Sequence, residues 1–173
     1  MPKEKYIIKK AQANDVDAVI KLYDTVNDYY SAPGWGKGVY PTLTSVRYTV
    51  DKDNLYILVS DGEVLGACTL DHEQHPAYAL QPWGINAQNE QVIVVHEMAS
   101  HPNHRRKGIG KKLIEYSIDH AKKCNATTIR LDTHITNIPA RALYEKCGFH
   151  EITQWTGTIL GIQQTFSVFE YLL

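Results

Sequence analysis

Apolar residues recur along this chain with two different periods. The run Val92–Ser100 is mostly apolar and rich in β-branched side chains, which predicts a buried strand. From residue 108 to residue 123 apolar positions recur every three or four residues, which predicts an amphipathic helix with its polar side chains in solvent. The same spacing follows Asn14, which we expect to cap the first helix, and a later helix has Pro139 near its start and ends at Gly148.

Six further segments are expected to be strands, and in the last two of them apolar and polar residues alternate. We expect them at residues 6–10, 55–60, 63–71, 127–134, 151–156 and 164–172. The dipeptide Asp61-Gly62 suits a two-residue hairpin turn between the second and third of these strands, because both of its positions tolerate positive φ. Residues 157–161 are the expected turn of the terminal hairpin, which could supply an edge strand for a homodimer.

The order of the elements predicts one domain, residues 1–173, of α/β class. A strand, a helix and a strand in succession imply a right-handed crossover, so the strands at 92–100 and 127–134 should be parallel. With 43% hydrophobic residues and no repeat or shift in composition, the chain can bury most of its apolar surface in one core.

The segment between the strand at 92–100 and the helix that follows is the main candidate for a binding site. Two glycines, Gly108 and Gly110, allow the backbone to turn tightly and to approach a ligand. The first N–H groups of the helix lack intrahelical partners and favour an anion. Four cationic residues surround them: Arg105, Arg106, Lys107 and Lys111. This much positive charge favours a pyrophosphate.

The spacing excludes two familiar phosphate-binding loops. A P-loop requires a hydroxyl residue after Gly-Lys, where this chain has Lys112, and the dinucleotide fingerprint requires a third glycine, where it has Leu113. The remaining pattern, (Arg/Gln)-x-x-Gly-x-Gly over residues 105–110, resembles the acyl-coenzyme A loop of the GNAT superfamily of N-acetyltransferases. Residues 137–149 resemble a second block of that superfamily, Asn-x-x-Ala-x-x-Leu-Tyr-x-x-x-Gly-Phe.

The resemblance implies a central, mostly antiparallel twisted sheet with one parallel, splayed strand pair and helices on both faces. In GNAT proteins the pantetheine arm of acetyl-CoA binds the backbone groups that the splayed strands leave unpaired. The resemblance therefore implies an acetyl-CoA-dependent N-acetyltransferase. It assigns the cosubstrate to Met98, Ala99, Ser100, Arg105, Arg106, Lys107, Gly108, Ile109, Gly110, Lys111, Asn137 and Tyr144.

Acyl transfer to an amine requires removal of a proton, since an alkylamine of pKa ~10 is only about 0.1% neutral at pH 7. Glu97 and Asp132, near the ends of adjacent parallel strands, are the candidate bases, and Glu97 is preferred. Alternatively, Glu97 pairs with a nearby cation and Asp132 caps the next turn. Tyr144 matches the tyrosine that protonates the leaving thiolate in the family, unless it is a core aromatic. A strand N–H near Met98 to Ser100 could stabilise the oxyanion.

Two irregular segments could border the acceptor. Residues 29–41 are rich in glycine and aromatic residues, so that Trp35 and Tyr40 form either a binding wall or a cover for the core. A short helix capped by Thr42 or Thr44 should follow and end near Asp53.

The second irregular segment runs from residue 71 to residue 90, and loops of this length are usually functional or mobile. His72 and His75 lie on it three residues apart but have no third ligand at a regular spacing, so we expect solvated histidines and no metal site.

Composition excludes several classes of partner. A net charge of −1 argues against nucleic acid or an anionic membrane as the main partner. The polar N-terminus has no signal-peptide core and no apolar run approaches the ~18 residues of a membrane span, so we expect a cytoplasmic protein. Three cysteines cannot all pair, and no disulfide is expected. No motif supplies Cys147 with a general base, which favours direct transfer in a ternary complex.

The sequence does not identify the acceptor, which could be a small molecule, an amino acid or a peptide N-terminus. Two other functions remain open. One is a non-catalytic module that senses acyl-coenzyme A, and the other is a different nucleotide-binding protein that uses the same anion site.

Overall fold

The computed structural model describes residues 5–30 and 34–173. Within them the strands are β1 (Ile7–Lys10), β2 (Leu55–Ser60), β3 (Glu63–Asp71), β4 (Val92–Ser100), β5 (Thr128–His134), β6 (His150–Ile159) and β7 (Ile162–Leu172). The helices are α1 (Val16–Tyr29), α2 (Leu43–Asp51), α3 (Ile109–Lys123) and α4 (Ile138–Lys146). Short 3-10 turns lie at Ala13–Asp15, Pro76–Leu80, Asn89–Gln91 and Pro102–His104. No helix in this part of the chain is long and apolar enough to span a membrane.

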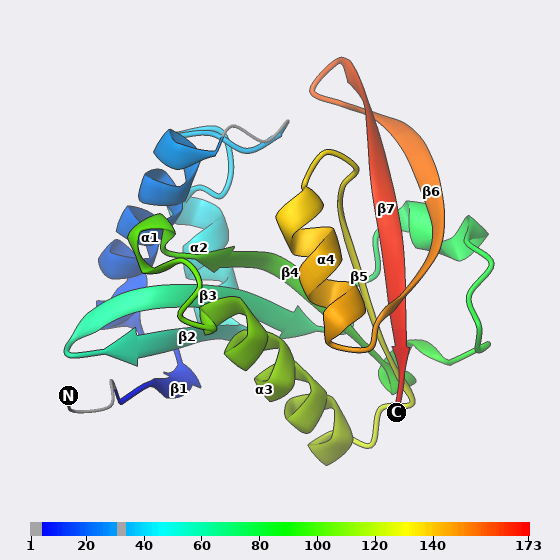
Figure 1. Ribbon diagram of the computed structural model, residues 1–173, viewed down its shortest axis with the longest axis horizontal. Helices are drawn as coiled ribbons and strands as arrows, with labels where there is room; N and C mark the ends of the chain where they lie inside the picture. The colour runs from blue at the N-terminus through cyan, green and yellow to red at the C-terminus, as the bar shows by residue number, and fades with distance from the viewer. Residues whose placement is uncertain (1–4, 31–33) are drawn as a thin grey trace. The chain divides into compact units, whose positions relative to one another are not determined.

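The described strands form a mixed sheet in the order β1-β2-β3-β4-β5-β7-β6 (Figure 1). The pairs β1–β2, β2–β3, β5–β7 and β6–β7 are antiparallel, and the pair β4–β5 is parallel. The parallel ladder runs from Val92↔Thr128 to Val94↔Arg130 and then stops, although both strands continue. The predicted fold class, with one splayed parallel pair, is therefore confirmed. β6 is an edge strand of this sheet, and pairing of two copies through it stays a prediction.

The chain forms two compact units. The first comprises the chain up to Leu70 together with Glu97–Leu113, and the second comprises Asp71–His96 and Ile114–Leu173. That they act as one functional domain stays a prediction.

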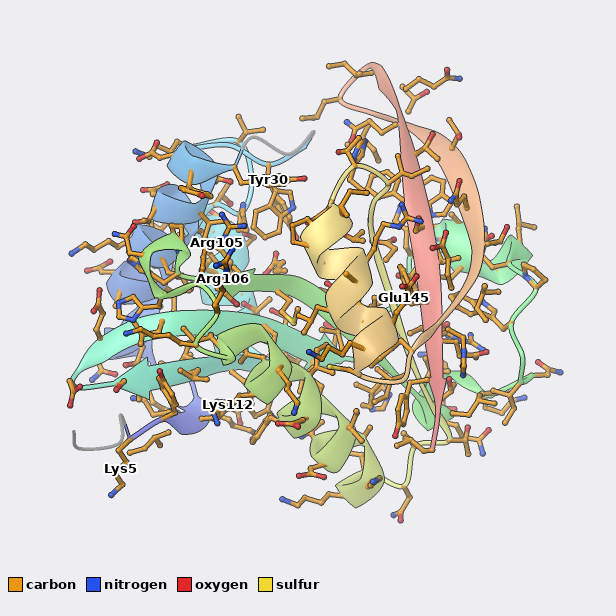
Figure 2. All side chains as sticks on the ribbon, in the orientation of Figure 1. Lys5, Tyr30, Arg105, Arg106, Lys112 and Glu145 are labelled. Carbon is orange, nitrogen blue, oxygen red and sulfur yellow. The ribbon has the colours of Figure 1, made fainter. Side chains whose placement is uncertain are left out.

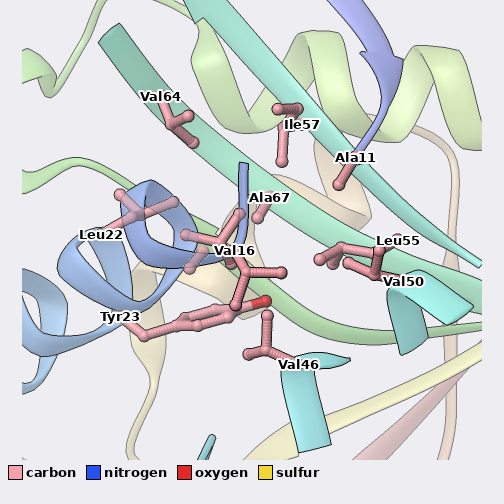
Figure 3. Close-up of a cluster of buried hydrophobic side chains, with 12 residues drawn as sticks. Ala11, Val16, Leu22, Tyr23, Val46, Val50, Leu55, Ile57, Val64 and Ala67 are labelled. Carbon is pink, nitrogen blue, oxygen red and sulfur yellow. The ribbon is translucent and has the colours of Figure 1, made fainter. Parts of the chain in front are cut away.

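In the first unit, α1 and α2 cover one face of the β2–β3 hairpin. The helical period of α1 buries Val16, Val19, Leu22 and Tyr23, which pack with residues of α2, β2 and β3 (Figure 3). The turn between β2 and β3 is Asp61-Gly62, with φ of 50° and 81°, as predicted.

The start of α1 differs from the prediction. Asn14 lies inside a 3-10 turn, and the N-cap of α1 is Asp15. The backbone N–H of Gln12 donates to the Asp15 carboxylate at 2.9 Å, and the N–H of Asp15 donates to the carbonyl of Gln12 at 2.8 Å. This reciprocal pair of hydrogen bonds starts a 3-10 turn at Gln12, two residues before Asn14, the cap that the sequence suggested. For α2 the cap is Thr42, whose hydroxyl accepts from the N–H of Ser45 at 3.1 Å.

In the second unit, β5, β7 and β6 lie side by side (Figure 1). The terminal hairpin is confirmed, but its turn is shorter than the predicted residues 157–161. Cross-strand pairing continues through Gly157↔Gln164 to Ile159↔Ile162, and the chain reverses at Leu160-Gly161, both with positive φ. A tight turn of this type matches the twist of the hairpin, so the ladder continues across a glycine that suggested a loop.

A buried ion pair anchors the long segment between β3 and β4. Arg130 and Glu170 are 4% and 2% exposed, and their Nε and Oε1 atoms lie 3.3 Å apart. Arg130 also donates to the side chain of Gln74 at 2.8 Å and to the carbonyl of Ile85 at 2.9 Å, and it lies over the ring of Trp83. The ion pair therefore holds a segment that lacks long regular elements.

Candidate active site

The loop between β4 and α3 gathers exposed cations on an unusual backbone. Residues 105–108 are exposed, and Arg106 and Gly108 have φ of 63° and 79°. The carbonyl of Gly108, just before α3, accepts a hydrogen bond from the N–H of Lys112 at 2.9 Å. The N–H groups of the first helical turn have no carbonyl one turn earlier, so this end of α3 suits an anion.

Gly66 on β3 lets the first turn of α3 come close to the sheet. A Cβ at this position would lie 2.7 Å from Cγ2 of Ile109 and 3.3 Å from the carbonyl oxygen of Ala99. Any larger residue would displace Ile109, which is 2% exposed and fixes the start of α3. The position of the loop therefore depends on a glycine outside it.

Arg105 links this loop to the end of α1. Its guanidinium lies 5.2 Å from the centre of the Tyr29 ring and donates to the Tyr29 hydroxyl. Figure 2 shows Arg105 and Arg106 together on the loop that leads into α3. A guanidinium has five N–H donors, so Arg105 keeps donors for a phosphate while it contacts Tyr29.

Glu97 occupies a strained position within β4. Its φ is 50°, which is costly for a residue with a Cβ and re-aims the side chain within the strand. One carboxylate oxygen accepts a hydrogen bond from the Tyr40 hydroxyl, and the other accepts from the Thr69 hydroxyl at 3.3 Å. The Tyr23 hydroxyl donates to the backbone carbonyl of Glu97 at 3.1 Å. Two hydroxyls thus orient the carboxylate and a third holds the backbone of the same residue, and the sequence connected none of the three to Glu97.

The aromatic residues around Glu97 serve both the core and the site. Trp35 packs edge-on against Tyr23 and Tyr40, with ring centres 5.7 and 6.1 Å apart, and it covers the core of the first unit. Burial raises the pKa of Tyr23 well above its ordinary value, and the charge of Glu97 raises it further. Tyr23 therefore remains a hydrogen-bond donor. The sequence left open whether Trp35 and Tyr40 form a binding wall or cover the core. In the structure Trp35 covers the core, and Tyr40 contacts the candidate base.

Asp132 belongs to the second unit. It is half-buried, and burial of the carboxyl raises its pKa, an effect that a hydrogen bond from Tyr78 and the nearby His96 and His75 oppose. Burial also raises the pKa of Tyr78 well above its ordinary value, so Tyr78 remains a donor. Asn137 is the residue that caps the following helix, so the alternative of a capping role for Asp132 has no support there.

We expect Asp132→Asn to stabilise the protein increasingly as the pH rises. Burial raises the folded-state pKa of Asp132 above the unfolded-state value of about 3.9, so as the pH rises between these two pKa values the carboxyl ionises in the unfolded state while it stays protonated in the fold, and the fold loses stability. The amide does not ionise. The gain in free energy of unfolding should reach about 1.4 kcal/mol for each unit of pKa difference, and urea unfolding from pH 3 to pH 8 measures it. Asp119→Asn, on the exposed side of α3, makes the same chemical change as a control, and an equal gain there would contradict the expectation.

The two remaining predicted site residues also lie in the second unit. Asn137 accepts a hydrogen bond from the N–H of Ala140 at 3.3 Å and donates to the Thr133 hydroxyl at 3.1 Å. Tyr144 is 5% exposed, and its ring packs against Phe149 and Phe169. The ring is therefore part of the aromatic core, while the phenol acts electrostatically on the pKa of Tyr78. A role as general acid stays a prediction.

The structure brings the predicted residues together in two groups. The first unit holds Glu97, Met98, Ala99, Ser100, Arg105, Arg106, Lys107, Gly108, Ile109, Gly110 and Lys111. The second holds Asp132, Asn137 and Tyr144. Sequence reasoning missed Tyr23, Thr69 and Tyr78, and it named Tyr40 without its partner. The aromatic content of residues 29–41 was the one signal for Tyr40.

The chain matches known acetyltransferases. The sequence model of the acetyltransferase (GNAT) family matches residues 19–149. An uncharacterized N-acetyltransferase of Methanocaldococcus jannaschii is 25% identical over 151 residues, which are 84% of this chain and 61% of that protein. The chain thus spans less than two thirds of the length of that relative.

Two further matches concern a shorter segment and the fold. The ribosomal protein bS18-alanine N-acetyltransferase of Escherichia coli is 39% identical over 56 residues, 32% of this chain and 38% of that protein. The crystal structure of a GNAT-family acetyltransferase from Streptococcus pneumoniae matches 98% of this chain and 100% of that chain, with a TM-score of 0.75 and 16% identity. At this identity the structural match speaks for the fold alone.

Proposed function

The chain belongs to the acetyltransferase (GNAT) family, whose acetyl donor is acetyl-CoA, and on that premise we propose that it acetylates a primary amine. The observation that carries the proposal is the carboxylate of Glu97, held by two hydroxyl donors at a strained position of β4. A carboxylate held in this way is suited to accept the proton of an amine. We assign the role of general base to Glu97.

The residues of the first unit fit the chemistry of acetyl-CoA. We assign its pyrophosphate to the loop of residues 105–111, because exposed cations and the start of a long helix favour a double negative charge there. We assign the pantetheine arm to the backbone of Met98, Ala99 and Ser100, which lie beyond Val94↔Arg130, the last pair of the parallel ladder. The thioester supplies an activated carbonyl, and a strand N–H among these residues would stabilise the oxyanion.

Direct attack of the amine in a ternary complex is the mechanism we propose. Glu97 takes a proton from the ammonium group, and the neutral amine then attacks the thioester carbonyl. The leaving thiolate needs a proton, which we assign to the hydroxyl of Tyr144. The protein contributes by binding the amine and the thioester in a fixed orientation, because reaction between two oriented groups replaces a bimolecular encounter in solution.

The acceptor we propose is the primary amine of a small molecule, an amino acid or a peptide N-terminus. The Escherichia coli relative acts on an alanine of ribosomal protein bS18, and this chain resembles a 56-residue part of it. A peptide with an N-terminal alanine is therefore the first acceptor to test.

Acetyl-CoA should stabilise the purified protein against heat more than ATP or NAD does. A ligand at about 100 times its dissociation constant adds about 2.7 kcal/mol to the free energy of unfolding, which corresponds to a few degrees in Tm for a protein of this size. An Arg106→Ala and Gly108→Val double variant should lose this shift, because it removes a cation and the residue at φ 79°. No shift with acetyl-CoA would contradict the proposal. A shift without acetylation of any amine would instead favour a sensor of acyl-coenzyme A.

A further inference from the structure

Glu97 receives two side-chain hydrogen bonds, and their donors differ in exposure. Thr69 is 2% exposed, whereas Tyr40 is 37% exposed. Tyr23, which holds the backbone carbonyl of the same residue, is 1% exposed. Of these three residues, Tyr40 is therefore the one that solvent and a solvated substrate reach most readily.

The chain from Gly36 to Tyr40 is built to hold this hydroxyl in place. The N–H of Gly36 donates to the carbonyl of Tyr40 at 2.9 Å, and the N–H of Tyr40 donates back to the carbonyl of Gly36 at 3.1 Å. Lys37 pairs with Asp28 of α1 at 2.6 Å, and Trp35 packs edge-on against the Tyr40 ring. A turn fixed in this way to α1 and to the core keeps an exposed ring directed at one carboxylate.

We infer that Tyr40 is a proton relay, through which the acceptor amine delivers its proton to Glu97. This inference rests on the proposed function. The ammonium group of the acceptor donates a proton to the Tyr40 hydroxyl oxygen as the Tyr40 proton passes to the carboxylate oxygen that it already contacts. One N–H bond breaks, one carboxyl O–H bond forms, and Tyr40 ends the step as a neutral phenol.

This arrangement gives Thr69 a different task. Its hydroxyl donates to the other carboxylate oxygen and, through burial, is shielded from the acceptor. Thr69 is therefore a positioning residue, which fixes the carboxylate so that the oxygen on the Tyr40 side takes the proton. The relay also lets a half-buried carboxylate act on an amine that it does not touch.

Tyr40→Phe removes the relay and keeps the ring. With a tripeptide that has an N-terminal alanine as acceptor, we expect kcat at pH 7 to fall about 100-fold, while the KM for acetyl-CoA stays unchanged. The loss should shrink toward pH 10, because the amine then arrives neutral and needs no relay. Combined with Glu97→Gln, the substitution should cause no further loss, since both remove the same proton path.

Tyr48→Phe is the matched control, because it deletes the same atom from an exposed tyrosine on α2. It should keep the rate and pH profile of the unaltered protein. A loss in Tyr40→Phe that is equal at pH 7 and pH 10, or no loss at all, would overturn the relay while the acetyltransferase assignment stands. Absence of turnover in the unaltered protein with the tripeptide, lysine amide and phenethylamine would overturn the proposed function, and the relay with it.

Discussion

Replacing Glu97 by glutamine is expected to lower kcat by about 10²- to 10⁴-fold, the range that general-base catalysis contributes. Glutamine keeps the size of the side chain and an oxygen that Tyr40 or Thr69 can donate to. It cannot take a proton at any pH of interest. The affinity for acetyl-CoA should not change, because the loop of residues 105–111 is not altered. Steady-state kinetics from pH 6 to pH 10, with calorimetric titration of acetyl-CoA, measures both.

Asp132→Asn is the comparison that makes this result informative. Both carboxylates were candidate bases from the sequence, and both keep their shape as amides. If Asp132→Asn loses the activity and Glu97→Gln keeps it, the assignment of the base is wrong and passes to Asp132. Loss of activity in Glu97→Gln together with a normal rate in Asp132→Asn would support the role proposed for Glu97.

The strain at Glu97 explains why a base here needs so many partners. A positive φ at a residue with a Cβ costs of order 1 to 3 kcal/mol and persists only where surrounding contacts fix it. Tyr23 holds the carbonyl of this residue, and Tyr40 and Thr69 hold its carboxylate. Contacts to both the backbone and the side chain of this residue thus offset its strain and fix the direction of its carboxylate.

The sequence predicted the elements with strong periods and missed contacts between distant positions. The bounds of β2, β3 and β4 were predicted as observed, because an apolar run or a hairpin dipeptide is a local signal. The turn of the terminal hairpin was predicted too long, since Gly157 suggested a turn where cross-strand pairing continues the ladder. At such positions cross-strand pairing outweighs the local preference of glycine for turns.

In the candidate site too, the sequence predicted the part with a local signal and missed the contacts between distant residues. The glycines and cations of residues 105–111 are contiguous, so their spacing alone pointed to an anion site. The contact between Tyr40 and Glu97 joins residues 57 positions apart, and the contact between Tyr23 and Glu97 joins residues 74 apart. No periodicity or spacing encodes such pairs, because they arise when the chain packs. A single sequence identified the charged loop and left the surroundings of the base undetermined.

Arg130→Met should lower the free energy of unfolding by about 3 to 5 kcal/mol, the cost of leaving one partner of a buried ion pair uncompensated. Glu170 would keep hydrogen bonds from the Thr128 hydroxyl at 3.1 Å and the N–H of Gly84 at 2.6 Å, but it would lose the guanidinium that balances its charge. Arg130 also holds the carbonyl of Ile85, so the segment before β4 should become more sensitive to protease than the rest of the second unit.

The double variant Arg130→Met and Glu170→Leu tests the cause of that loss. It removes both charges, so it should recover much of the stability that Arg130→Met loses, whereas a loss caused by missing packing would persist or grow. Urea unfolding of the three proteins at one pH measures the difference. As a control, Arg141→Met removes the cation of a more exposed pair, that of Arg141 with Glu151 at 2.9 Å, and should cost clearly less. An Arg130→Met variant that is no less stable than Arg141→Met would contradict the view that the buried pair holds the segment between β3 and β4.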